Sequence, residues 1–225
     1  MSVLVFGASG ALGSKILEHL SDSGNEVLGF TTNKNAQGLT FLDETGNWLR
    51  EVVETKGSKS VVFAQGVNLN DSILNLGDIR KVLDINLLFV IEKLENLLKA
   101  GALGQGSSVV ILSSIWQEIS RQNKLSYTVS KSAIRGLVNS LVADLGPLGI
   151  RVNAVLPGVI DTPMTRKALS AEAINRIERE TPFGKLVSED ELASVVSWLL
   201  SRESQGVLGQ FIQVDNGWTN VKLLP

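Results

Sequence analysis

Short apolar runs of strand length recur along the chain, and longer segments with helical spacing separate them. The runs before position 160 are apolar throughout and lack the alternation of a strand with one exposed face. They and the last run are Val3 to Phe6, Val27 to Phe30, Leu39 to Leu42, Val61 to Ala64, Val109 to Leu112, Val152 to Leu156 and Phe211 to Val214. We expect strands of a sheet that is covered on both faces.

The segments between these runs place apolar residues three or four positions apart. Such residues are Leu12, Ile16 and Leu20, then Leu83, Leu87, Ile91, Leu94 and Leu98, and later Ile134, Leu137, Leu141 and Leu145. Strand and helix therefore alternate, which is typical of a parallel sheet with right-handed crossovers. We predict an α/β fold: a Rossmann-type doubly wound parallel sheet of about seven strands with helices on both faces. Long helices are expected at about 76–100 and 126–146.

The length of 225 residues fits one domain, 1–225, because no repeat, low-complexity tract or linker divides it. One charged stretch, 163–188, interrupts the approach to the last helix and strand. Insertions beside the carboxyl edge of a sheet often cover a substrate. We expect this stretch to be a substrate lid.

Charge and composition narrow the possible partners. The net charge is -2 and the pI about 5.6, which gives no basic surface for nucleic acid or an anionic membrane. The chain has no cysteine and one histidine, His19, so no metal site is expected. The N-terminal apolar run lacks the flanks of a secretory signal, and no run approaches a transmembrane span. We expect a cytoplasmic protein that acts on a small molecule.

A glycine-rich turn directly follows the first predicted strand. Its candidate cofactor-binding residues are Gly7, Ser9, Gly10, Leu12 and Gly13. Glycines allow close approach of a pyrophosphate, and the N-terminus of the next helix offers free N–H groups to it. An isolated GxxGxxG is equally often a plain turn, but its place at the first strand-to-helix junction favours a dinucleotide.

The end of the second strand discriminates between the two nicotinamide dinucleotides. An acidic residue there binds the adenosine ribose and repels a 2′-phosphate, yet this chain has Thr31, Thr32, Asn33 and Lys34. Their hydroxyl, amide and ammonium groups can donate to a phosphate. NADP(H) is therefore expected to be preferred over NAD(H), although these could be ordinary turn residues and no arginine is present to clamp a phosphate.

Tyr127 and Lys131 lie at i and i+4 at the start of a predicted helix, which places them on one face. Taken alone, such a pair is usually a solvated surface pair. Tyr127, however, is the only tyrosine of the chain and follows Ser114, at a strand end, by thirteen residues. These details favour a catalytic pair.

Taken together, these motifs resemble those of the short-chain dehydrogenase/reductase family, and particularly its ketoacyl-reductase-like branch, over essentially the whole chain. The resemblance rests on the glycine turn, Asp43, Asn86, Ser114, Tyr127, Lys131, the stretch Arg151-Val152-Asn153-Ala154-Val155-Leu156-Pro157-Gly158, Thr162 and the closing Val214-Asp215-Asn216-Gly217. It implies an NAD(P)-dependent oxidoreductase that moves hydride between nicotinamide and a carbonyl or alcohol. It also implies further cofactor contacts at Asp43, Ala64, Gln65, Gly66, Pro157, Gly158, Ile160 and Thr162.

The resemblance assigns a role to each of four catalytic residues. Tyr127 would exchange a proton with the substrate oxygen, Ser114 would hydrogen-bond that oxygen, and Asn86 would hold a helix and a water for proton relay. Lys131 would bind the nicotinamide ribose and activate Tyr127. An ammonium about 4 Å from the phenol, at an effective dielectric near 20, contributes up to roughly 4 kcal/mol, enough to lower the phenol pKa from about 10 toward neutrality.

Two departures from the family pattern accompany these matches. Ala11 replaces the middle glycine of the family turn, while Gly10 gives the turn a GxxGxxG pattern with Gly7 and Gly13. After the fourth strand, Phe63-Ala64-Gln65-Gly66 replaces Asn-Asn-Ala-Gly, which leaves open how the central sheet is stabilised there.

Other activities were weighed against the carbonyl reductase or alcohol dehydrogenase. A non-catalytic redox sensor that binds dinucleotide is disfavoured because all four catalytic residues are retained. An enoyl reductase is disfavoured because that branch spaces tyrosine and lysine more widely.

Two further expectations concern the substrate pocket and the contacts between subunits. Segments 115–124 and 164–167 would line the pocket with one aromatic face and several polar or cationic groups. This favours a polar or anionic substrate, such as a sugar derivative or acyl thioester. The two long helices resemble those that the family packs across a two-fold axis, so a homo-oligomer, tetramer or dimer, is expected.

Overall fold

A computed structural model describes residues 2–43, 46–55 and 59–222. Across these residues, seven parallel strands form one sheet in the order β3-β2-β1-β4-β5-β6-β7. The strands are β1 (Ser2–Phe6), β2 (Glu26–Thr31), β3 (Thr40–Phe41), β4 (Lys59–Phe63), β5 (Ser108–Leu112), β6 (Arg151–Pro157) and β7 (Phe211–Val214). The predicted doubly wound parallel sheet is confirmed, and each expected apolar run contains a strand.

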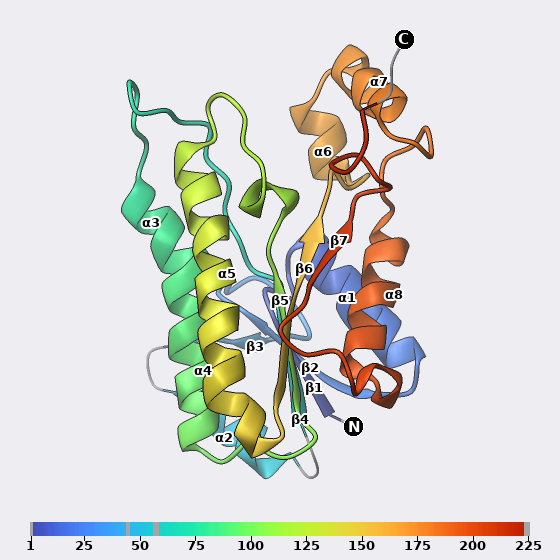
Figure 1. Cartoon of the computed structure of the whole chain (residues 1–225). Helices are drawn as coiled ribbons and strands as arrows, with labels where there is room; N and C mark the ends of the chain where they lie inside the picture. Colours follow the sequence, from blue (N-terminus) through green and yellow to red (C-terminus); the bar gives the residue numbers. More distant parts are fainter. Residues whose placement is uncertain (1, 44–45, 56–58, 223–225) are drawn as a thin grey trace.

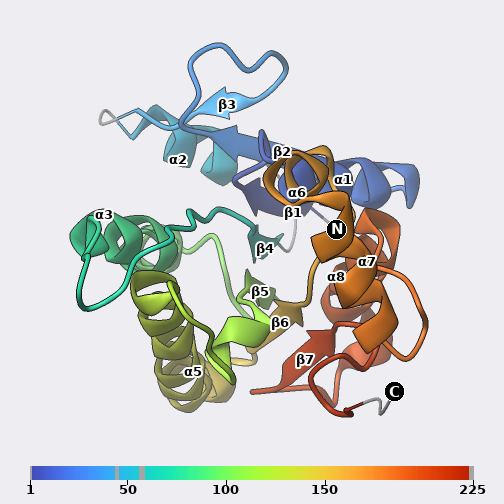
Figure 2. The same ribbon diagram turned by 90° about the horizontal axis from the view of Figure 1, so that it is seen from above.

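Helices cover both faces of this sheet (Figures 1 and 2). One face carries α1 (Ala11–Asp22) and α8 (Glu189–Leu200), which pack against each other. The other carries α2 (Asn47–Glu54), α3 (Ile79–Leu83), α4 (Phe89–Lys99) and α5 (Leu125–Leu145). Two short helices, α6 (Pro163–Ala168) and α7 (Ala171–Glu180), lie above the carboxyl ends of the strands.

Alternate residues of each buried strand enter different cores, because successive side chains of a strand point to opposite faces. In β1, Leu4 and Phe6 join the core under α4 and α5, whereas Val3 and Val5 join the core under α1 and α8. All of β1 is buried, which explains why its sequence is apolar at every position instead of alternating.

Three phenylalanines stack across the ends of neighbouring strands. Phe6 on β1 pairs in register with Phe30 on β2 and Phe63 on β4, at ring-centroid distances of 4.9 Å and 5.1 Å. Trp48 and Phe89 meet Phe6 edge-on. Phe63 occupies the position of the family's first asparagine, so aromatic packing stabilises the central sheet at this point.

The expected continuous helix at 76–100 is wrong in detail. The structure has α3, a π-helical turn at Asp84–Leu88, and then α4. A π turn admits one extra residue per turn and is frequent at functional sites. Asn86, one of the predicted catalytic residues, lies within it.

The part of the chain that the structure describes lacks two further features. No helix there is long and apolar enough to cross a membrane. No group of three or more His, Cys, Asp or Glu side chains in that part of the chain is arranged to hold a metal ion.

Candidate active site

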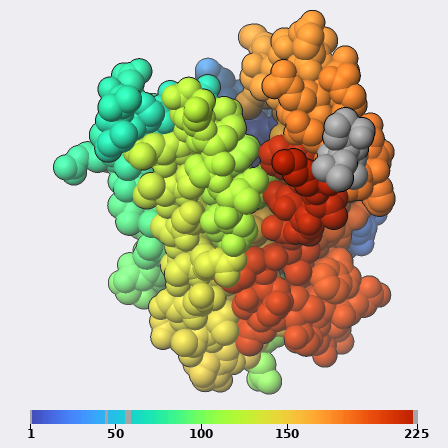
Figure 3. All heavy atoms as spheres, turned by 45° about the horizontal axis from the view of Figure 1, so that its top comes forward, coloured from blue at the N-terminus to red at the C-terminus, as the bar shows by residue number. Residues whose placement is uncertain are grey.

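A cavity of about 340 Å³ opens at the carboxyl ends of the central strands. Its walls come from the turn after β1, the segments after β4, β5 and β6, the start of α5, and α6. Figure 3 shows a hollow between the α5 side and the orange residues of α6 and α7, with blue N-terminal residues at its floor. Parallel α/β sheets bind ligands at this edge, where the crossovers diverge.

The turn after β1 requires glycine at two positions. Gly7 has φ +80°, and a Cβ there would lie 2.5 Å from the backbone nitrogen of Gln65. A Cβ on Gly13 would lie 2.2 Å from the backbone oxygen of Gly7. The turn therefore packs directly against the segment after β4, and Gly10 and Leu12 line the cavity beside it.

This turn has the features that a dinucleotide needs. α1 begins without a side-chain cap and with no acidic residue in its first turn, so its N–H groups and positive dipole end face the cavity unopposed. Gln65 lines the same cavity, and its Oε1 is, within the described residues, the one buried side-chain atom without a hydrogen-bond partner. A bound ligand with a hydroxyl donor would satisfy it. The residues present thus fit a nicotinamide dinucleotide.

The residues after β2 divide into two groups. Thr31 is buried, and its hydroxyl lies 2.7 Å from that of Ser9 while accepting from the backbone N–H of Asn33. The expectation that Thr31 faces a cofactor phosphate is therefore corrected, because its hydroxyl ties two turns together. Thr32 and Asp43 line a separate hollow of about 260 Å³.

Ser114 and Tyr127 meet at the centre of the cavity. Ser114 follows β5 after one intervening residue, and Tyr127 lies in the first turn of α5, so the end of a strand and the start of a helix place both at the cavity. The Ser114 hydroxyl is near enough to the phenol to lower its pKa, and it accepts from the backbone N–H of Trp116 at 3.4 Å. A substrate oxygen in this cavity could contact both hydroxyls.

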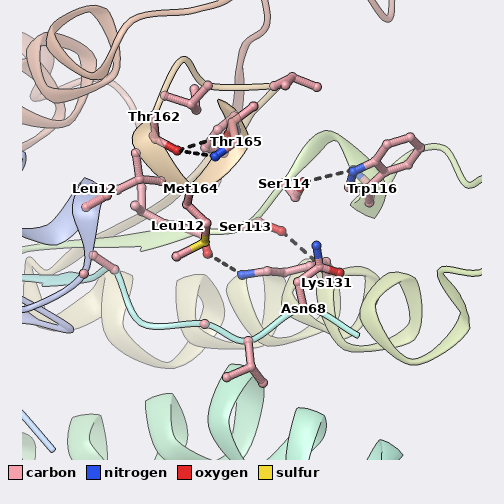
Figure 4. A pocket seen from close by; sticks show the side chains of 18 of the residues that line it. Leu12, Asn68, Leu112, Ser113, Ser114, Trp116, Lys131, Thr162, Met164 and Thr165 are labelled. Atoms are coloured by element: carbon pink, nitrogen blue, oxygen red, sulfur yellow. Dashed lines mark hydrogen bonds between the residues drawn. The ribbon is translucent and has the colours of Figure 1, made fainter. Parts of the chain in front are cut away.

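Lys131 lies one helical turn after Tyr127, with its ammonium near the Tyr127 ring. Its Nζ donates to the backbone oxygen of Leu112 at 2.8 Å and lies 5.7 Å from the centroid of the Tyr127 ring (Figure 4). Burial lowers the pKa of Lys131 to about 8. Burial also raises the pKa of Tyr127 above its usual value near 10, and the neighbouring Ser114 hydroxyl opposes this. In this arrangement the phenol holds its proton at neutral pH.

Asn86 connects the segment after β4 to α5. Its Oδ1 accepts from the backbone N–H of Val67, and its Nδ2 donates to the Val67 oxygen and to the Ser130 hydroxyl. Ser130 donates in turn to the backbone oxygen of Tyr127. Asn86 therefore holds the helix turn that carries Tyr127, although it does not line the cavity.

The cavity brings together most of the residues predicted from the sequence. Those that line it are Gly10, Leu12, Ala64, Gln65, Gly66, Ser114, Tyr127, Lys131, Pro157, Gly158, Ile160 and Thr162. Gly7, Ser9, Gly13, Thr31, Thr32, Asn33, Asp43 and Asn86 are not among its lining residues. The glycines and Asn86 support its walls.

Sequence reasoning missed two residues beside Tyr127. Asn68 lines the cavity, and Lys124, buried with 4% exposure, donates from Nζ to Asn68 Oδ1 at 2.6 Å. Lys124 had been placed only within a general polar segment. Its burial could not be inferred from the sequence, because Lys124 precedes α5 and has no periodic context.

Comparison with known proteins identifies the family. A family model described as Enoyl-(Acyl carrier protein) reductase matches residues 60–219. The chain belongs to the short-chain dehydrogenase/reductase family. Accordingly, it is an NAD(P)-dependent oxidoreductase that acts on a CH–OH or C=O group.

Curated relatives match nearly end to end. The chain is 28% identical to "Uncharacterized oxidoreductase YmfI" of Bacillus subtilis (strain 168), covering 96% of this chain and 98% of that protein. It is 27% identical to "3-oxoacyl-[acyl-carrier-protein] reductase FabG" of Escherichia coli (strain K12), with 95% of both chains covered.

Solved structures share the fold. A short chain dehydrogenase family protein from Francisella tularensis has a TM-score of 0.84 and 29% identity, covering 97% of this chain and 98% of that one. The aldohexose dehydrogenase of Thermoplasma acidophilum has a TM-score of 0.89 and 26% identity, covering 100% of this chain and 96% of the other. These likenesses confirm the predicted fold class and the resemblance to ketoacyl reductases.

Proposed function

We propose that this short-chain dehydrogenase/reductase reduces the carbonyl group of a polar substrate with NADPH, and catalyses the reverse oxidation. The observation that carries the proposal is that Ser114, Tyr127 and Lys131 line one cavity together with the glycine turn. The ketoacyl reductase and aldohexose dehydrogenase among the relatives act on polar substrates by name, which supports the substrate class.

The catalytic residues have separate tasks in this proposal. The bound cofactor supplies the hydride that forms the new C–H bond. Ser114 donates to the carbonyl oxygen and holds it, while Tyr127 gives its proton to that oxygen as the C=O π bond breaks. The raised pKa of Tyr127 suits this direction, because the phenol arrives protonated. Lys131, whose ammonium now donates to the Leu112 oxygen, would hold the ribose hydroxyls of the cofactor.

Two elements outside this centre belong to the proposal. The segment 163–188 acts as a lid: Thr162, Met164 and Thr165 line the cavity, and Thr162 caps α6 through the Thr165 N–H. Reduction of a carbonyl, rather than of a C=C bond, is favoured by the i, i+4 spacing of Tyr127 and Lys131 on α5.

The preference for NADPH rests on the residues after β2. No carboxylate follows the strand directly, and Thr32, Asn33 and Lys34 carry groups that can donate to a 2′-phosphate. The expected result is a lower Kd for NADPH than for NADH in a fluorescence titration. A Kd for NADH that is tenfold lower than that for NADPH would overturn the preference and leave the reaction intact.

A homo-oligomer, tetramer or dimer, in the cytoplasm completes the proposal. Large apolar side chains are exposed on the helices that resemble the family's interface, among them Leu88, Ile91 and Val129. Burying them against a second copy would remove apolar surface from water. Light scattering at micromolar concentration should give a multiple of 24.2 kDa; a monomer contradicts this part.

The experiment that tests the reaction is a cofactor absorbance assay with the purified protein. A panel of ketones and alcohols, each with both cofactors, should include substrates whose turnover changes nicotinamide absorbance. Tight cofactor binding without turnover of any polar carbonyl would support the non-catalytic sensor instead.

A further inference from the structure

Two cations lie near one end of the cavity, the buried Lys124 and the exposed Arg121, and neither has an assigned task. Lys124 is buried and donates to Asn68, which lines the cavity. Arg121 lies with its guanidinium 5.7 Å from the ring centroid of Trp116, which also lines the cavity. We call these two cations, with Asn68 and Trp116, the cationic end of the cavity.

The cationic end lies away from the glycine turn that would hold the cofactor phosphates. In Figure 4, Leu12 lies on one side of the cavity and Trp116 on the other, while Asn68 is on the Lys131 side. The Nζ of Lys124 is 5.6 Å from the centroid of the Tyr127 ring, so its charge lies beside the catalytic tyrosine. A charge at this place acts on the substrate rather than on the pyrophosphate.

Neither cation is neutralised by a carboxylate in the described part of the chain. No ion pair there includes Lys124 or Arg121. Asp71 acts on Lys124 through space, but its own oxygens accept from Ser126 and Gly77. Burial of an unpaired ammonium is costly, and such groups usually meet a ligand or counter-ion.

The cavity walls match an anionic ligand as well. None of the lining residues is acidic, and Lys131 is a cation. Because Asn68 Oδ1 accepts from Lys124, its Nδ2 donor is left for the cavity. The desolvated environment that lowers the pKa of Lys124 to about 8 still leaves it mostly protonated at pH 7.

We propose that the cationic end binds an anionic group of the substrate, a carboxylate or a phosphate ester, held by the Asn68 amide and the Lys124 ammonium close to the reacting carbonyl. The proposal rests on the proposed carbonyl reduction, because it names the substrate class of that same cavity. Charge-assisted hydrogen bonds from Lys124 would make the anion a determinant of specificity.

The test uses matched substrates that differ in the anionic group. Acetoacetate is compared with its methyl ester, and dihydroxyacetone phosphate with dihydroxyacetone, which separates the carboxylate from the phosphate. In wild-type protein, kcat/KM should be at least about tenfold higher for the anion of one pair, with the difference mostly in KM. Added salt should reduce this ratio.

Variants assign the preference to Lys124. Lys124→Met should lower the ratio of anion to neutral kcat/KM about tenfold, whereas Lys124→Arg should retain most of it. The ratio cancels any effect of Lys124 on the Tyr127 hydroxyl, because both substrates of a pair need the same proton. Lys99→Met, at an exposed lysine paired with Glu95 on α4, is the matched control and should leave the ratio unchanged.

Calorimetric binding of the same four compounds to the protein with its cofactor separates the two proposals. Anion binding that Lys124→Met weakens, without turnover of any compound, supports the cationic end and contradicts the reaction. Turnover with equal kcat/KM for anion and neutral partner in wild-type protein supports the reaction and overturns the cationic end. The wild-type comparison decides this even if Lys124→Met fails to fold.

Discussion

The ends of β4 and β5 lie side by side in the sheet but carry different kinds of side chain: aromatic at the end of β4, the aromatic end, and polar after β5, the polar end. β4 ends in Phe63, which stacks on Phe6 inside an aromatic cluster. β5 is followed by Ser113 and Ser114, both buried; the Ser113 hydroxyl donates to Gln117, and the Ser114 hydroxyl accepts from the backbone N–H of Trp116. One strand end is stabilised by packing, and the other by polar groups that must each find a partner.

This difference shows how the fold separates stability from chemistry. The aromatic end stabilises the fold through apolar burial and ring stacking, and a smaller side chain there would leave a cavity. The polar end carries two almost fully buried lysines, Lys124 and Lys131, whose lowered pKa values reflect the cost of burial. Active sites commonly retain such destabilising groups because the reaction needs them.

The largest expected effect comes from removing one hydroxyl at the polar end. Tyr127→Phe should lower kcat by roughly 10²- to 10⁴-fold, because the proton donor is lost, while the fold and the cofactor Kd persist. The measurements are kcat on a verified substrate, cofactor Kd by fluorescence, and circular dichroism. A near wild-type kcat in this variant means that Tyr127 is not the proton donor.

At the aromatic end, the same comparison predicts a loss of stability. Phe63→Ala should reduce the free energy of unfolding by about 3–5 kcal/mol, because it opens a cavity beside Phe6. Urea denaturation followed by circular dichroism measures this change. Phe183→Ala, at a side chain that is 72% exposed, is the matched control and should change stability by about 0.5 kcal/mol or less. Equal losses in both variants contradict the role of the stack.

The pH dependence of stability gives the smallest expected effect. Both lysines have a pKa of about 8 in the folded protein, against about 10.5 when unfolded. Between these values the unfolded chain binds more protons, so the free energy of unfolding should rise from pH 8 to pH 10, by up to about 2 kcal/mol for each lysine. The gain is lost as the pH falls back from about 10.5 to 8, and below pH 8 the two lysines contribute no further change.

Lys131→Met separates the contributions of the two lysines to this pH dependence. The variant should keep only the part of the rise that Lys124 contributes, about half, because the second buried ammonium is gone. Denaturant midpoints at several pH values between 7 and 10 measure it. Above pH 10 the raised pKa of Tyr127 acts in the opposite direction, because the unfolded phenol loses its proton first. An unchanged slope in the variant would show that Lys131 is not buried as a cation.

Several elements of the site followed from sequence because they depend on local spacing. The i, i+4 pair Tyr127 and Lys131, the serine at the end of a strand and the glycines of the first turn have spacings that hold in any copy of the fold. Thr31 was interpreted wrongly because the sequence does not show which hydroxyls bond inside the protein, and its partner Ser9 lies 22 residues away. The bond from Lys131 to the backbone oxygen of Leu112 could not be predicted for a similar reason, since Leu112 lies 19 residues away.

The sequence by itself determined the alternation of strands and helices, because hydrophobic periodicity reports which faces must be buried. It also determined the catalytic residue types, because only a few side chains can exchange a proton with a substrate oxygen. Only the tertiary structure decided that Phe63 replaces a polar contact by stacking, that Asn86 lies in a π turn, and that Lys124 is buried beside Tyr127. These features depend on groups that are distant along the chain, and folding alone brings them within contact distance.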